Sequence, residues 1–141
     1  MSEEQVTEIL NKYRVIAIVG ASNTIGKPSH RVAAYLKQHG YKIIPINPNI
    51  TELFGEKSYK SLLDVPPQIQ ATIDVVDIFR KSEDVPPIVD QVIELKQRTG
   101  RPFVVWMQQD IVNEGAAEKA RQAGLVVVMD KCLMKEHLHR R

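Results

Sequence analysis

The chain has little that would cross-link it, anchor it or attract it to a polyanion. Cys132 is its only cysteine, which excludes an intrachain disulfide. It has no recognisable secretory signal and no apolar run of about 18 residues, the length a membrane-spanning helix needs. Lys and Arg exceed Asp and Glu only by 19 to 17, so the basic excess of nucleic-acid-binding proteins is missing too. These absences predict a cytoplasmic protein whose partner is neither a membrane nor a nucleic acid.

Residue spacings typical of metal sites and catalytic sites are also missing. The histidines, at positions 30, 39, 137 and 139, follow no zinc-ligand spacing. Cys132 would need an activating base, and His137 lies five positions further on, where we expect it to face another side of one helix. A buried structural role is therefore predicted for Cys132, and the chain is predicted not to be an enzyme.

The composition, by contrast, is that of a folded globular domain. Hydrophobic residues make up 43% and charged residues 26% of 141, which fits one domain spanning residues 1–141 with a sizeable core. Short runs rich in β-branched and aromatic residues predict five strands, at 14–20, 41–46, 73–79, 103–107 and 125–129. Pro45 lies in the second run and lacks a donor, which predicts an irregular spot near that strand's end.

Helical patterns alternate with these runs. Apolar residues at helical spacing predict a helix over 85–96, and further helices are expected at 2–12, 29–38, 114–123 and 130–138, with one short turn in 57–64. Strands alternating with helices indicate an α/β fold. We predict a three-layer, Rossmann-like open parallel sheet of about five strands with helices on both faces.

The loop after the first strand has the features of a phosphate cradle. Gly20-Ala21-Ser22 follows a buried strand, and Lys27-Pro28-Ser29 opens the next helix. A helix N-terminus offers unpaired N–H groups and a positive dipole end. In such a sheet the residues after each strand converge toward this loop. These residues are Asn47-Pro48, Phe79-Arg80, Gln108-Gln109 and Asp130-Lys131.

Two common nucleotide motifs do not match the loop. In the dinucleotide fingerprint G-x-G-x-x-G, Ser22 and Ile25 would occupy the second and third glycine positions. Asn47 stands where an acid would hold the ribose of NAD. A Walker loop is excluded as well, because Gly26-Lys27 comes one position late and Pro28 replaces the magnesium-binding hydroxyl.

The chain resembles the small stand-alone coenzyme A-binding proteins, which are related to the N-terminal domain of succinyl-CoA synthetase α subunits. The resemblance covers nearly the whole chain. It is carried by Gly20-Ala21-Ser22, Lys27-Pro28-Ser29, Tyr35-Leu36, Gly40-Tyr41, Pro45-x-Asn47-Pro48, Gly55, Tyr59-x-Ser61-Leu62, Asp74-x-Val76-Asp77-x-Phe79-Arg80, Trp106-x-Gln108, Ala123-Gly124-Leu125 and Asp130-x-Cys132-x-x-x-Glu136-His137. One departure is Asp110, where the family usually has glycine.

The resemblance implies that the chain binds coenzyme A (CoA) or an acyl-CoA. The pyrophosphate would lie at the first loop and helix start, the adenine-ribose end near Asn47-Pro48, and the pantetheine arm beside Phe79, Trp106 and Gln108. The implied binding residues are Gly20, Ala21, Ser22, Lys27, Pro28, Ser29, Asn47, Pro48, Phe79, Arg80, Trp106 and Gln108.

Other interpretations remain open from the sequence. The chain could be an NAD(P)-binding or acyl-CoA-processing enzyme or subunit, or an interaction protein with a vestigial pocket. Arg80 could pair with Glu83 or Asp84, Trp106 could be core, and Asn47-Pro48 could be only a turn. Monomer and homodimer are both compatible with the sequence, and it does not decide whether Lys27 or Arg80 binds the 3′-phosphate.

Overall fold

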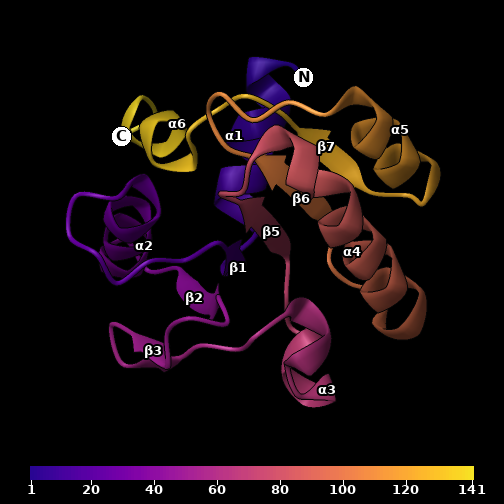
Figure 1. Cartoon of the computed structure of the whole chain (residues 1–141). Coiled ribbons are helices and arrows are strands. Elements are labelled where there is room, and N and C mark those ends of the chain that lie inside the picture. Colours follow the sequence, from indigo (N-terminus) through magenta and orange to yellow (C-terminus); the bar gives the residue numbers. More distant parts are fainter.

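The fold is built on a five-stranded parallel sheet, described here from a computed structural model of residues 1–141. The strand order is β2-β1-β5-β6-β7 (Figure 1). The strands are β1 (Val15–Val19), β2 (Lys42–Ile46), β5 (Val75–Ile78), β6 (Val104–Met107) and β7 (Val126–Val128). All five predicted strands and the Rossmann-like α/β fold are thus confirmed.

Helices cover both faces of this sheet, which explains why its strands are nearly all apolar. One face packs against α1 (Glu3–Lys12), α2 (Pro28–Gln38) and α6 (Leu133–Leu138), and we call it the α2 face. The other packs against α4 (Val85–Thr99) and α5 (Glu114–Gln122) and is called the α4 face. In Figure 1, α2 and α6 lie on one side of the sheet and α4 and α5 on the other.

The order of the strands places a crevice at the end of β1. The chain moves from β1 outward to β2, and then returns to the other side of β1 with β5, β6 and β7. Helices following β1 and β5 therefore lie on opposite faces, and the loops after these two strands separate. This switch point lies beside Gly20, as the sequence predicts for a ligand site.

The prediction of an irregular spot at Pro45 is wrong. Pro45 lies within β2 in register with Ile18. β2 is an edge strand, and the carbonyl of Pro45 faces outward, where it accepts a hydrogen bond from the Tyr59 N–H (3.1 Å). The nitrogen of Pro45 faces the same outer side, so no ladder bond to β1 is lost.

Several short elements differ from the predicted pattern. The segment after β2 forms a hairpin of two-residue strands, β3 (Glu52–Leu53) and β4 (Glu56–Lys57), which the sequence did not indicate. The predicted turn in 57–64 is the 3₁₀ helix η1 (Leu62–Asp64), and α3 (Pro67–Gln70) follows it. A second 3₁₀ turn, η2 (Ser82–Asp84), precedes α4, and the last helix begins at Leu133 rather than at 130.

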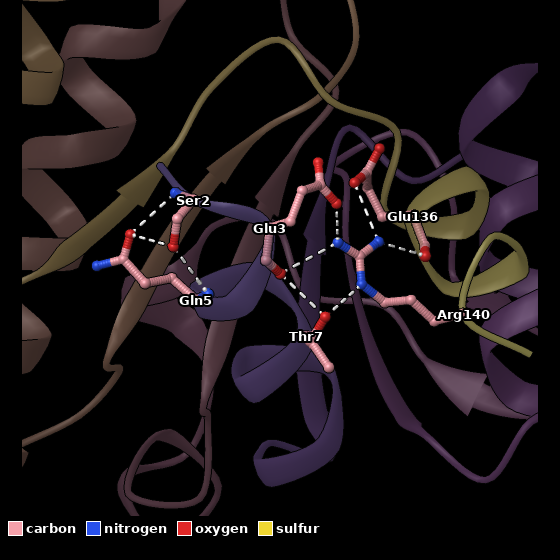
Figure 2. A network of polar contacts seen from close by, with 6 residues as sticks. All are labelled: Ser2, Glu3, Gln5, Thr7, Glu136 and Arg140. Atoms are coloured by element: carbon pink, nitrogen blue, oxygen red, sulfur yellow. Dashed lines mark hydrogen bonds and ion pairs between the residues drawn. The ribbon is translucent and has the colours of Figure 1, made fainter.

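A polar network joins the two ends of the chain and fixes α6 (Figure 2). The Arg140 guanidinium donates hydrogen bonds to the Thr7 hydroxyl (2.7 Å) and to the Glu136 carbonyl (2.8 Å), and it pairs with the carboxylates of Glu3 and Glu136. Ser2 and Gln5 form a capping box at the start of α1. Because α6 supplies part of the cavity described below, this network also positions the site.

None of the helices is both long and apolar enough to cross a membrane.

Candidate functional site

The loop after β1 begins at a glycine that the fold requires. Gly20 has φ +89°, a left-handed conformation that L side chains rarely adopt. A Cβ there would lie 2.8 Å from the Phe79 carbonyl oxygen and 3.1 Å from Cδ of Arg80. The ends of β1 and β5 therefore approach too closely for any side chain at position 20.

Gly20→Ala is expected to destabilise the fold by about 2–4 kcal/mol, from left-handed strain together with the clash at the Phe79 carbonyl. Gly26→Ala is the matched control, because Gly26 also has a positive φ (+97°) but no atom lies within 4 Å of the point that its Cβ would occupy. That variant should lose only about 1–2 kcal/mol. Urea unfolding of both variants measures the difference in the free energy of unfolding. Equal losses in the two variants would show that the clash with the Phe79 carbonyl is relieved.

Two side chains hold the rest of the loop in place. The Asn47 side-chain amide donates to the Ala21 carbonyl (2.6 Å), and its oxygen accepts the Asn49 N–H (2.8 Å). The Ser22 hydroxyl accepts the Thr24 N–H (3.0 Å). Asn47 thus acts on the loop itself, which fixes the direction of the backbone around Ala21.

The first turn of α2 has free backbone donors. Lys27 is the N-cap residue and makes no side-chain capping bond, and Pro28 occupies the first helical position, where an N–H is not needed. The N–H groups of Ser29 and His30 have no protein acceptor. This end of the helix can therefore accept an anion.

The loop and the α2 N-terminus open onto a cavity of about 570 Å³. The cavity is bounded by the β1 loop, the first turns of α2, the loop after β6 and the start of α6. Its lining residues are Gly20, Ser22, Lys27, Pro28, Ser29, Arg31, Val32, Phe79, Gln108, Gln109, Asp110, Ile111, Cys132, Met134 and Lys135. A cavity of this size suits a small molecule or part of a larger nucleotide.

Positive charge dominates this cavity. Lys27, Arg31 and Lys135 line it, and Asp110 is its only acid. Neither Lys27 nor Arg31 belongs to any ion pair, and Lys135 donates only to the uncharged Gln109 side chain (2.9 Å). Cations without a protein counter-ion beside a free helix N-terminus favour a negatively charged ligand.

Two buried polar side chains also line the cavity. Ser29 is 5% exposed and Gln108 4% exposed. The Gln108 side-chain oxygen accepts the Leu133 N–H (3.1 Å), but its NH₂ group and the Ser29 hydroxyl make no hydrogen bond within the protein. Neither group is enclosed by protein, so both are open to the cavity, where a ligand or solvent can take up their hydrogen bonds.

The structure brings together seven of the twelve predicted site residues. Gly20, Ser22, Lys27, Pro28, Ser29, Phe79 and Gln108 line the cavity. Ala21 and Trp106 are fully buried outside it, and the Trp106 indole donates to the Lys131 carbonyl (2.8 Å). Arg31, Met134 and Lys135 also line the cavity, and they are not among the predicted residues. Of these three residues, only Arg31 could have been predicted from the sequence, because it lies four positions after Lys27 and so on the same helix face.

Arg80 and Pro48 lie at a second, smaller cavity of about 300 Å³ on the other side of the β1 end. Lys60 lines this second cavity as well. Arg80 forms no ion pair with Glu83 or Asp84, although the sequence left that open. Basic residues are therefore available on both sides of the Gly20 loop.

Asp110 occupies a left-handed position, with φ +71°. This geometry explains why glycine suits the position, since glycine adopts it without strain. The Asp110 N–H donates to the Asp130 carboxylate (2.6 Å), which holds the loop after β6 to the loop after β7.

Asp110→Asn is expected to strengthen anion binding by about fivefold to tenfold, because it removes the one negative charge of the cavity. Asparagine tolerates the left-handed conformation, so the loop should keep its shape. The dissociation constant for CoA, measured by calorimetry at low salt, tests this. Weaker binding by the variant would mean that the Asp110 carboxylate contacts the ligand favourably.

The chain is similar to known proteins over nearly its whole length. Residues 14–138 match the family of CoA binding domains. "Uncharacterized protein YneT" of Bacillus subtilis is 38% identical over 136 residues, which cover 96% of this chain and 94% of YneT. A "hypothetical protein" of Pyrococcus horikoshii OT3 with a solved structure is 38% identical and superposes with a TM-score of 0.88 over 99% of this chain and 92% of that one.

A larger relative shares only part of its length. Acetate–CoA ligase (ADP-forming) of Methanocaldococcus jannaschii is 48% identical over 61 residues, which are 43% of this chain but 9% of the ligase. The match of residues 14–138 and the full-length likeness to YneT agree with the motifs from the loop at Gly20 to His137. The chain therefore belongs to the CoA-binding domain family.

Proposed function

We propose that this protein binds CoA or an acyl-CoA in the cavity beside the α2 N-terminus and does not turn it over. The observation that carries the proposal is the placing of two unpaired cations, Lys27 and Arg31, beside the free N–H groups of Ser29 and His30. Membership of the CoA-binding domain family supports CoA as the anion.

The residues present fit the parts of CoA. The pyrophosphate would accept hydrogen bonds from the amides of Ser22 and Ser29, with Lys27 and Arg31 balancing its charge. Each charge-assisted hydrogen bond contributes about 1.5–3 kcal/mol. The unpaired NH₂ of Gln108 could donate to a pantetheine carbonyl.

The proposal of binding without catalysis is supported by the surroundings of the reactive side chains. His137 Nδ1 lies 2.7 Å from the Tyr35 hydroxyl on α2, and no hydrogen bond joins His137 to Cys132. Burial, aided by His39, Arg141 and Arg14, lowers the pKa of His137.

Titration calorimetry tests this function. CoA should bind far more tightly than NAD, because NAD lacks the 3′-phosphate and the pantetheine arm and finds no acid at Asn47 for its ribose. Equal or reversed affinities would overturn the proposal. Incubation with acetyl-CoA tests the second part, since hydrolysis or acyl transfer above the rate without protein would show an enzyme.

A further inference from the structure

Cys132 lies in the wall of the same cavity. Cys132 is 7% exposed and lines the cavity just before α6. It is the only cysteine of the chain. A molecule in the cavity therefore lies beside Cys132, and the chain has no second thiol that could react with it.

The cavity also holds polar groups that point to a ligand near Cys132. Ser29 and Gln108 are more than nine-tenths buried, and the Ser29 hydroxyl and the Gln108 NH₂ have no protein partner. The other end of the Gln108 amide accepts the N–H of Leu133, the residue directly after Cys132. A ligand amide bound to Gln108 would thus lie close to the backbone that carries the Cys132 thiol.

The pantetheine arm has the matching chemistry. It contains two amides, and its thiol follows the second amide after two methylene groups. If Gln108 binds that amide, the thiol of CoA is held within a short reach of Cys132. The cations Lys27 and Arg31, in the same cavity, would bind the phosphates of the same molecule.

We propose that Cys132 captures CoA covalently, by thiol–disulfide exchange with the disulfide of CoA; this rests on the proposed CoA site. The Cys132 thiol gives its proton to solvent, and the thiolate attacks one sulfur of the CoA disulfide. A bond forms between Cys132 Sγ and that sulfur while the original sulfur–sulfur bond breaks. The second CoA leaves as a thiolate and takes up a proton, so no further oxidant is needed.

The mixed disulfide would persist until an external thiol removes it. Intramolecular resolution needs a second cysteine, which the chain does not have. The protein would then bind reduced CoA reversibly, and it would bind CoA covalently when CoA is present as its disulfide. That coupling makes the site a redox-dependent store for CoA.

Intact-mass spectrometry of the reduced protein after exposure to CoA disulfide tests the capture. One CoA adduct per chain is expected, located on Cys132 by peptide mapping and removed by dithiothreitol. Its formation should be at least about tenfold faster than that of the adduct from glutathione disulfide, because only CoA disulfide is concentrated by the cavity. Arg31→Ala should reduce this rate advantage.

Cys132→Ser and Cys132→Ala are the matched controls. The alanine variant is used if the buried serine hydroxyl disturbs folding. Both should bind CoA in calorimetry and form no adduct. The covalent capture would be overturned if no adduct formed, or if the CoA adduct formed no faster than the adduct from glutathione disulfide. CoA binding in calorimetry would still support the CoA site in either case. Absence of CoA binding by the reduced protein would overturn the proposed function itself.

Discussion

Ser22→Glu is expected to weaken CoA binding by about a hundredfold. A carboxylate about 5 Å from a phosphate, at an effective dielectric constant of about 20, costs about 3 kcal/mol, and about 1.4 kcal/mol corresponds to a factor of ten. Ser22 lines the cavity at the loop whose amides would bind the pyrophosphate. The glutamate would therefore put its charge where the ligand carries its own.

Ser22→Gln separates this charge effect from the loss of the serine. Both variants remove the hydrogen bond in which the Ser22 hydroxyl accepts the Thr24 N–H, and both add a side chain of the same length. Calorimetry should show the glutamine variant binding CoA much more tightly than the glutamate variant, with the gap shrinking at high salt. Similar losses in both variants would attribute the effect to the shape of the loop, and unchanged affinity in both would place the phosphates elsewhere.

Asp77→Val is expected to stabilise the fold at pH 7 by about 1–3 kcal/mol, the usual cost of an unpaired buried polar group. Asp77 lies in the central strand β5, in register with Ile18 and Trp106, and is 0% exposed. Neither of its carboxyl oxygens has a hydrogen-bond partner. Valine is branched, apolar and suited to a strand, so it should fit this apolar face of the sheet.

The effect of Asp77 should also depend on pH. Burial raises the pKa of Asp77 well above 3.8, so the folded protein keeps a proton that the unfolded chain releases. The free energy of unfolding of the natural protein should therefore fall as the pH rises above about 4. Asp77→Asn cannot ionise, so its free energy of unfolding should not show this decrease with pH. It keeps an unpaired polar group, so it should be stabilised less than Asp77→Val.

Urea unfolding at several pH values from 4 upward measures both variants against the natural chain. Asp90→Asn is a suitable control, because Asp90 is exposed and paired with Lys119 at the surface. Its effect should stay below about 1 kcal/mol at any of these pH values. A gap between Asp77→Asn and the natural protein that does not change with pH would show that Asp77 is not held neutral.

The elements with a strong local pattern could be predicted from the sequence. The five strands are short runs of β-branched residues, and the structure places each within about two residues of its predicted ends. The long helices have clear apolar spacing. The β3–β4 hairpin and α3 have two and four residues per element, too few to show any period. The role of Pro45 depended on which strand lies at the edge, which no local pattern shows.

Some residues of the candidate site could likewise be predicted from the sequence, and others could not. Gly20, Ser22 and Ser29 follow directly from a strand, its loop and the helix start, so their convergence was predictable from topology. Met134 and Lys135 enter the cavity because α6 packs beside α2 and is fixed to α1 through Arg140. That packing joins residues more than 100 positions apart, as the hydrogen bond between Tyr35 and His137 shows. The sequence carries no local signal for it.

Binding of CoA in the cavity beside the α2 N-terminus is tested most directly by heteronuclear NMR during a CoA titration. The backbone amides of Ser22 and Ser29 and the side-chain amide of Gln108 should show the largest shifts. The amide of Ala117, in α5 on the α4 face, should not move. Shifts confined to residues outside the cavity, or none at saturating CoA, would contradict the proposed site.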